Sequence, residues 1–280
     1  ADIDPVLILE LIEKEKIRSS LFVPAVILFL VSIPQAAETD FSSLKFVLYG
    51  ASPIADDTIL KAKEIMKCDL FQVYGLTETA GAITILMPED HDPEKGKLRS
   101  CGKALNSVEI KVVDDEGNEV KTGDIGEVIS KSPLNMKGYW NRPDATEEAI
   151  KDGWFYSGDA GFFDDEGYLY IHDRVKDMIV SGGENIYPAE VENALMSHPE
   201  IADAAVIGVP DDKWGESVKG FVVLQPDSSL DETEIISYSR TQIAGYKCPK
   251  TINFIEALPR NPSGKILRRE LREPFWEGKD

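Results

Sequence analysis

The chain has 280 residues, 42% of them hydrophobic, and a formal net charge of −20 at neutral pH. This length fits one large domain or two of ordinary size, and the hydrophobic content is normal for a globular protein. The strong negative charge argues against nucleic-acid binding, because a polyanion would be repelled.

Neither a membrane span nor a disulfide framework is expected. The longest apolar run, residues 21–33, contains Pro24 and is shorter than the roughly 20 residues that cross a bilayer. The cysteines Cys68, Cys101 and Cys248 are odd in number and have no paired spacing, which indicates reduced thiols and a cytoplasmic protein.

Strand and helix patterns alternate over residues 1–80. Helical periodicity covers residues 5–17, and Pro24 stands where a helix can begin. Short apolar strands are expected at residues 21–23, 45–49 and 70–74, with a helix that ends near Met66 between the last two. This alternation predicts an α/β segment built on a parallel sheet.

The pattern changes after residue 81. Alternating strands at residues 108–112 and 125–130 are separated by Asp-Gly and Glu-Gly turns, which predicts an antiparallel, β-barrel-like subdomain over residues 81–172. Together with residues 1–80 it would form one large domain, residues 1–172.

A third pattern begins near Asp173. Helices are expected at 188–197 and 231–243, and strands at 202–208, 217–224 and 251–256. The predicted fold class is therefore an α/β domain with a β-barrel subdomain, followed by a small α+β domain over residues 173–280.

Residues 74–79 (YGLTET) directly follow a predicted strand, where ligands of parallel sheets gather. Tyr74 can stack on a flat base, the Thr77 hydroxyl can bond a phosphate, and Glu78 can hold Mg²⁺. The alternative is a helix that Thr77 caps, with Glu78 in its first turn, and this alternative is favoured if the motif is taken alone.

Two further segments also follow predicted strands. Residues 50–53 (GASP) form a tight turn in which Gly50 would allow close approach of a ligand. Asp159 ends the run 154–159 (WFYSGD), where a carboxylate can accept both hydroxyls of a ribose; an ordinary turn aspartate is the alternative.

Two segments of the last domain stand out. Residues 173–192 begin with charges at the domain boundary and contain paired glycines, which indicates a hinge followed by a tight loop. Residues 259–271 are not a phosphate-binding loop, because the first glycine is missing and Ile266 replaces the metal-binding hydroxyl residue. These residues predict a turn that presents Lys265 to a ligand. The alternative is that Lys265 is an ordinary surface lysine in contact with solvent.

In order and spacing, these five motifs resemble the adenylate-forming superfamily of acyl-CoA synthetases, peptide-synthetase adenylation domains and firefly luciferase. The resemblance implies that ATP activates a carboxylic acid as acyl-AMP, with Mg²⁺ as cofactor, and that a thiol, here coenzyme A, then displaces AMP.

The resemblance also implies a nucleotide site in residues 1–174. The adenine and acyl pocket would be lined by Gly50, Ala51, Ser52, Tyr74 and Gly75. Thr77 would touch the α-phosphate, Glu78 would hold Mg²⁺, and the ribose would be held by Asp159 and Arg174.

For the last domain, the resemblance implies a moving part. Lys176 would be the hinge and Lys265 the lysine of the adenylation step. The coenzyme A and pantetheine contacts would come from Gly182, Gly183, Trp214 and Lys247.

One family feature is missing from these residues, namely the Ser/Thr/Gly-rich loop that cradles the outer phosphates of ATP. The chain is therefore expected to be a fragment that makes no acyl-adenylate alone. Two alternatives remain open: an adenylation domain that serves another thiol acceptor, and a non-catalytic, nucleotide-binding remnant. Small side chains at residues 79–82 favour a fatty or aryl acid over acetate.

Overall fold

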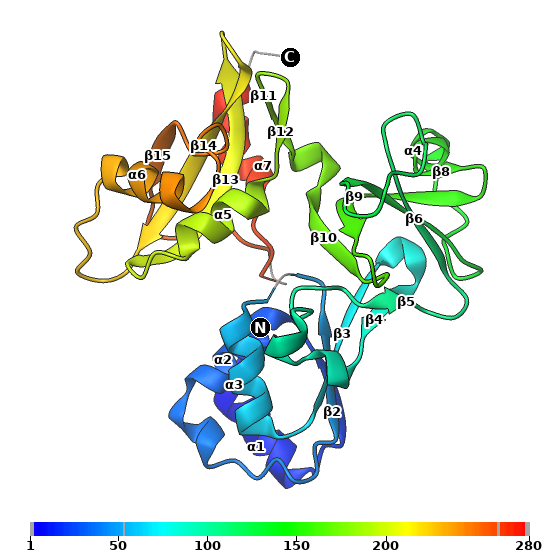
Figure 1. The fold of residues 1–280 in the computed structure, drawn as a ribbon. Coiled ribbons are helices and arrows are strands. Elements are labelled where there is room, and N and C mark those ends of the chain that lie inside the picture. The colour runs from blue at the N-terminus through cyan, green and yellow to red at the C-terminus, as the bar shows by residue number, and fades with distance from the viewer. Residues whose placement is uncertain (1–2, 53, 262–263, 278–280) are drawn as a thin grey trace. The chain divides into compact units, whose positions relative to one another are not determined.

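The computed structural model describes residues 3–52, 54–261 and 264–277. The chain divides into two compact units, Ala1–Ile171 and His172–Asp280, and each unit is described by itself (Figure 1). None of the helices in the described ranges is long and apolar enough to cross a bilayer.

A five-stranded sheet with the order β1-β2-β3-β4-β5 organises the first part of unit 1. Its strands are β1 (Ser19–Phe22), β2 (Phe46–Gly50), β3 (Asp69–Leu76), β4 (Gly81–Leu86) and β5 (Lys103–Ala104). The first three run parallel, as the alternating pattern predicts, whereas β4 and β5 are antiparallel additions. The first sheet therefore continues beyond residue 80, into the segment for which only a β-barrel-like subdomain was expected.

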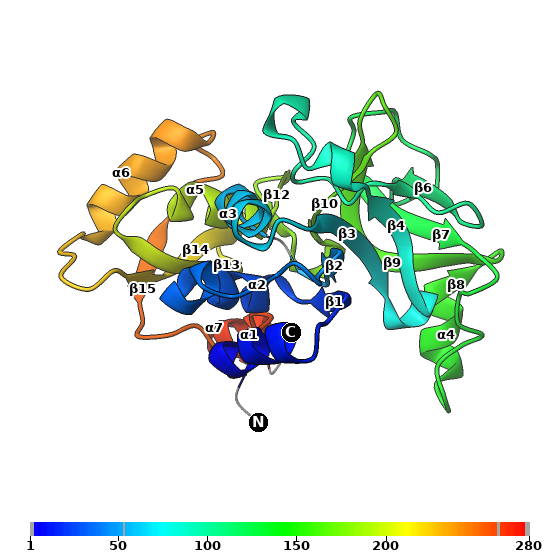
Figure 2. The ribbon, with the colours of Figure 1, turned by 90° about the horizontal axis from the view of Figure 1, so that it is seen from below.

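Three helices lie on one face of this sheet (Figures 1 and 2). They are α1 (Pro5–Lys14), α2 (Pro24–Ser32) and α3 (Asp56–Met66). Short 3₁₀ turns follow as η1 (Pro34–Ala37), η2 (Thr77–Thr79), η3 (Pro88–Asp90) and η4 (Pro93–Lys95). Asp4 caps α1 by accepting hydrogen bonds from two backbone N–H groups, and Pro24 opens α2 as expected. The apolar sides of the helices form one core with β2 and β3.

The second sheet of unit 1 has the strand order β10-β9-β7-β6, with β8 paired to β9. Its strands are β6 (Glu109–Val113), β7 (Gly126–Lys131), β8 (Ile150–Lys151), β9 (Trp154–Phe163) and β10 (Leu169–Arg174), and helix α4 spans Pro143–Ala149. Pairing between β6, β7, β8 and β9 is antiparallel, as expected. Closure of these strands into a barrel stays a prediction.

Unit 2 is an α+β structure around a sheet with the order β12-β11-β14-β13, to which β15 adds beside β14. After the turn η5 (Val175–Asp177), its elements are β11 (Ile179–Ser181), β12 (Glu184–Ile186), α5 (Pro188–Met196), β13 (Ile201–Asp211), β14 (Gly215–Leu224), α6 (Glu232–Gln242), β15 (Thr251–Phe254) and α7 (Arg268–Trp276).

Side chains that alternate along β13 reach two separate cores. Ala204 and Val206 pack with α5 and α6, whereas Ala205 and Ile207 pack with Leu271 of α7. Since successive side chains of a strand point to opposite faces, helices cover both faces of this sheet.

We expect Leu195→Ala to lower the free energy of unfolding of unit 2 by about 2–5 kcal/mol, because a buried leucine leaves a cavity. Leu195 is fully buried in α5, whereas its neighbour Met196 is 48% exposed. Met196→Ala is therefore the matched control and should change the free energy little. Urea unfolding of both variants measures the difference, and equal losses would contradict this packing.

Candidate functional site

The turn after β3 is held by Thr79, not by Thr77. The buried Thr79 hydroxyl accepts a hydrogen bond from the Leu76 N–H at 2.9 Å and lies 2.7 Å from the Gly81 carbonyl oxygen. Thr77 is exposed, and its hydroxyl has no hydrogen-bond partner within the described residues. The capping alternative for Thr77 is wrong, so this hydroxyl is free for a ligand.

Gly75 is required by the close approach of β4. A Cβ atom at this position would lie 1.9 Å from the Gly81 carbonyl oxygen, and the pairing register shifts between Tyr74 and Gly75. The bulge therefore tolerates no side chain at Gly75. It lies between Tyr74 and the turn that begins at Thr77.

Tyr74 and Asp159 lie 85 residues apart in the sequence but are in direct contact. The Tyr74 hydroxyl donates a hydrogen bond of 2.7 Å to Oδ2 of Asp159. Burial, together with the Asp159 charge, raises the pKa of Tyr74, so the phenol stays protonated and donates. The two residues expected at adenine and ribose are thus brought together.

Strand β9 has a bulge around Asp159, because its pairing with β7 shifts in register between Tyr156 and Ala160. Gly158 has a φ of +69°, and its N–H donates a 2.8 Å hydrogen bond to the Glu127 carboxylate. The Asp159 N–H in turn donates to the Ser157 hydroxyl at 3.0 Å. Burial raises the pKa of Glu127, and the nearby Asp159 charge adds to this effect.

Glu78 is tied to a segment that the sequence motifs did not single out. The Tyr139 hydroxyl donates a 2.8 Å hydrogen bond to Oε1 of Glu78, and the Met136 N–H donates to the Glu78 carbonyl oxygen at 2.6 Å. Tyr139 lies 61 residues from Glu78 in the sequence, so no local pattern could have indicated the contact.

A magnesium ion would fit Glu78. Mg²⁺ prefers one or two carboxylates together with phosphate oxygens and water. Among the described residues, no group of three or more His, Cys, Asp or Glu side chains could hold a metal ion by itself. Oε1 of Glu78 accepts the Tyr139 hydrogen bond, and the second oxygen is suited to a cation shared with a bound phosphate.

The Gly50 turn lies beside β3. Gly50 pairs with Val73, and a Cβ at Gly50 would meet the Val73 carbonyl oxygen at 2.1 Å. Ala51 has a φ of +72°, and Ser52 is half-buried. Because β2 and β3 are parallel neighbours, their carboxyl ends place this turn next to Tyr74. Pro53, the last residue of this motif, lies outside the described residues.

In unit 2, the paired glycines and Trp214 form one surface. Gly182 and Gly183 have φ values of +63° and +87° and make the turn between β11 and β12. The Gly182 N–H donates to the Trp214 carbonyl oxygen at 2.8 Å, and a Cβ at Gly182 would lie 2.7 Å from the indole ring. Gly182 is therefore needed for this contact, whereas Gly183 has open space around it and is favoured by its positive φ. Trp214 is 44% exposed, so the ring remains accessible.

Lys247 is engaged within the protein. Its Nζ lies 2.7 Å from both carboxylate oxygens of Glu190. The ion pair is partly buried, so the positive charge of Lys247 is already balanced by Glu190 before any ligand binds. Its contact with coenzyme A stays a prediction.

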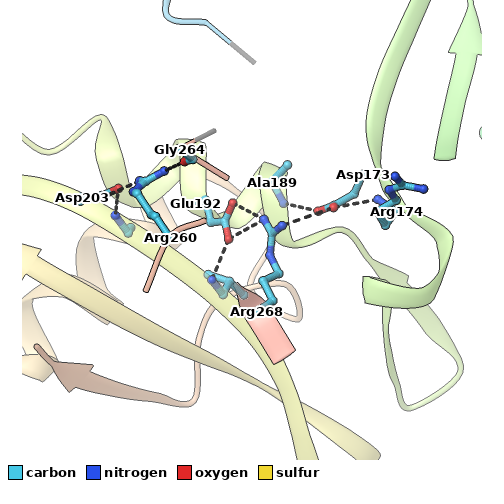
Figure 3. Close-up of polar contacts among 10 residues, drawn as sticks. Asp173, Arg174, Ala189, Glu192, Asp203, Arg260, Gly264 and Arg268 are labelled. Carbon is cyan, nitrogen blue, oxygen red and sulfur yellow. Dashed lines mark hydrogen bonds and ion pairs between the residues drawn. The ribbon is translucent and has the colours of Figure 1, made fainter. Parts of the chain in front are cut away.

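The expected hinge residue Lys176 is exposed and lies in η5, directly after Arg174, the half-buried last residue of β10. The preceding Asp173 is buried and accepts hydrogen bonds of 2.8 Å from the Arg174 and Ala189 N–H groups (Figure 3). Burial raises the pKa of Asp173, against the effect of nearby Arg268. The hinge role of Lys176 stays a prediction.

Lys265 is exposed on a closed turn. Its N–H donates a 2.9 Å hydrogen bond to the Asn261 side chain, while the Asn261 N–H donates to the Lys265 carbonyl oxygen at 2.9 Å. Within the described ranges, the Lys265 ammonium has no partner. Pro262 and Ser263, also part of this motif, lie outside the described residues.

Family models match both units. The model "AMP-binding enzyme" matches residues 1–140, and "AMP-binding enzyme C-terminal domain" matches residues 190–265. Both matches include motif residues of the site described above.

Curated relatives and solved structures are also similar to the chain. A fatty acid–[acyl-carrier-protein] ligase, ScoC of Streptomyces coeruleorubidus, is 42% identical over 95% of this chain and 51% of its own length. The long-chain-fatty-acid–CoA ligase FadD13 of Mycobacterium tuberculosis is 42% identical over 95% of this chain and 52% of its own. The amide bond synthetase McbA of Marinactinospora thermotolerans is 34% identical, with a TM-score of 0.89, over 98% of this chain and 56% of its own. The chain thus spans about half the length of the curated relatives it matches.

We expect Tyr74→Phe to lower the free energy of unfolding of unit 1 by about 1–3 kcal/mol, because the buried Asp159 carboxylate loses a donor. Tyr156→Phe is the matched control on β9, since the Tyr156 hydroxyl has no hydrogen-bond partner within the described part of the chain. Urea unfolding compares the two variants. A Tyr74→Phe protein as stable as the Tyr156→Phe protein would show that the hydrogen bond contributes nothing.

Proposed function

Because this chain belongs to the family of AMP-binding enzymes, we propose that it forms the nucleotide and thiol-transfer parts of a ligase that activates a fatty acid with ATP. In the first half-reaction, a carboxylate oxygen attacks the α-phosphorus, the bond to the bridging oxygen breaks, and pyrophosphate leaves. In the second, the sulfur of coenzyme A attacks the acyl carbon, and AMP leaves with the carboxylate oxygen.

The contact between Tyr74 and Asp159 is the observation that carries this proposal. It joins an aromatic ring to a carboxylate at the end of β3, one turn before the free hydroxyl of Thr77. Tyr74 stacks on adenine, and Asp159 accepts hydrogen bonds from the ribose hydroxyls. The Tyr74 hydroxyl orients the carboxylate for this task, and Thr77 donates to the α-phosphate.

Glu78 would hold the magnesium ion. When bound, Mg²⁺ neutralises phosphate charge during the adenylation step. The hydrogen bond from Tyr139 keeps one carboxylate oxygen in place, and the other would be available to the cation.

Unit 2 supplies groups to both half-reactions. The compact charge of Lys265 stabilises the negative charge that develops between the carboxylate and the α-phosphate. Rotation about Lys176 then exchanges Lys265 for the glycine turn, where Gly182, Gly183 and Trp214 accommodate the pantetheine arm.

The favoured acid is a fatty acid. The relatives ScoC and FadD13, both named for fatty acids, match 95% of the chain. Small side chains at residues 79–82 leave room beside the Thr77 turn. A panel of fatty, aryl and short acids, with pyrophosphate release as readout, tests this choice in the full-length enzyme, meaning these residues together with the family's amino-terminal half.

A second candidate acceptor is the thiol of an acyl carrier protein. The engagement of Lys247 by Glu190 favours it, because this cation is then unavailable to the phosphates of coenzyme A. ScoC, the relative named for this acceptor, is as similar as FadD13. Supplying acyl-adenylate with either coenzyme A or carrier protein, and measuring the thioester formed, separates the two candidates.

We expect Lys265→Ala in the full-length enzyme to lower the rate of adenylation by about 10²–10³, because one donor to the developing charge is lost. Thioester formation from supplied acyl-adenylate should remain nearly intact, since Lys265 acts only in the first half-reaction. Pyrophosphate exchange and thioester formation measure the two steps, with Arg269→Gln as control because Arg269 is exposed. Equal losses in both steps, or in neither, would contradict this role.

A further inference from the structure

Arg260 connects the turn that carries Lys265 to strand β13. Its Nη1 donates a 2.6 Å hydrogen bond to the carbonyl oxygen of Gly264, and its Nη2 donates at 2.7 Å to Oδ2 of Asp203 (Figure 3). Gly264 immediately precedes Lys265, so the guanidinium holds the peptide group from which the lysine extends.

Asp203, the anchor for Arg260, is held by a strand and by its own hydrogen bonds. Asp203 lies in β13, which pairs with β14 from Ile201 to Asp211 and shows a register shift next to Asp203. Oδ1 of Asp203 accepts a 3.0 Å hydrogen bond from the Ala204 N–H, which leaves Oδ2 for Arg260.

The other end of the turn is held by Arg268, the first residue of α7. Its Nη2 lies 2.8 and 2.7 Å from the two carboxylate oxygens of the buried Glu192 (Figure 3). Glu192 also accepts a 2.8 Å hydrogen bond from the Val206 N–H. The Nη1 of Arg268 lies 3.9 Å from Oδ1 of Asp173.

The two arginines have different consequences when they are removed. Loss of Arg268 would leave two buried carboxylates without their cation, which threatens the fold itself. The Arg260 side chain is 40% exposed, and exposed ion pairs contribute little to stability. The geometry of the turn is therefore the main thing that depends on Arg260.

We propose that Arg260, anchored by Asp203, is a positioning residue that fixes the Lys265 backbone for adenylation. This inference rests on the proposed function of Lys265. A lysine side chain has a flexible four-carbon stem, so its ammonium reaches one position reliably only if its backbone is held. Arginine suits this task because its planar fork can bond a carboxylate and a carbonyl oxygen at the same time.

Arg260→Gln in the full-length enzyme is the direct test. Since a displacement of about 1 Å in a reacting group can cost about 10²-fold in rate, we expect kcat for adenylation to fall by about 10- to 100-fold. The KM values for ATP and acid should change little, because the guanidinium of Arg260 is bonded to Gly264 and Asp203 within the protein. Thioester formation from supplied acyl-adenylate should match the wild type, as should both steps in the Arg269→Gln control.

The Lys265→Ala background separates positioning from a general effect on the fold. If Arg260 acts through Lys265, Arg260→Gln should cause no further loss of adenylation in that background. A further loss as large as in the wild-type background would overturn the inference, as would a wild-type kcat in the single Arg260→Gln variant.

Two outcomes distinguish this inference from the function on which it rests. If Lys265→Ala adenylates normally, the proposed function of Lys265 has failed. If Lys265→Ala is crippled but Arg260→Gln is not, only the positioning role has failed.

Asp203→Ala provides a second variant if Arg260→Gln does not fold. It keeps the Arg260 bond to Gly264 but frees the guanidinium from β13, so kcat for adenylation should fall in the same direction with KM unchanged. Thermal unfolding of each variant shows whether it is folded, and a folded Asp203→Ala enzyme with normal kcat would also overturn the inference.

Discussion

The hydrogen bond between Tyr74 and Asp159 is the contact on which the proposed nucleotide site depends. It links the end of β3 in the first, mixed sheet to the bulge of β9 in the second sheet, and the same Tyr74 packs against the core of the second sheet. A ring that stacks on a base and a carboxylate that binds a ribose must keep a constant separation if both are to hold one nucleoside. Because Tyr74 and Asp159 are hydrogen-bonded to each other in the protein itself, their separation is set before a ligand binds.

Local patterns in the sequence were enough to predict the parallel strands, the helices between them and the α+β character of unit 2, because periodicity and turn residues act over short distances. They could not predict that β4 turns back along β3, or that Thr79 in place of Thr77 holds the turn between them. Nor could they predict the contact between Glu78 and Tyr139, since a pairing across 61 residues leaves no local signal. The motif residues themselves were recognisable because their order resembles a known superfamily; their partners were not.

In the proposed mechanism, Lys265 moves together with unit 2, and contacts within the unit hold the turn that carries it. If rotation about the hinge is to deliver Lys265, the lysine must be fixed relative to the rest of the unit, or the rotation would not determine where its ammonium arrives. Arg260 and Arg268 provide this by tying the two ends of the turn to β13 and α5. The glycine turn beside Trp214 belongs to the same sheet through the pairing of β11 with β14. One rigid unit can therefore carry both sets of groups.

The most direct test of the nucleotide site is the affinity of the full-length enzyme for AMP and for 2′,3′-dideoxy-AMP, measured by isothermal titration calorimetry. If Asp159 accepts the ribose hydroxyls, removing both should weaken binding at least about tenfold, since hydrogen bonds to a charged group contribute about 1.5–3 kcal/mol each. In Asp159→Ala the two nucleotides should bind with nearly equal affinity, because the acceptor is gone. Equal affinities in the wild-type enzyme, or an undiminished difference in Asp159→Ala, would contradict the account.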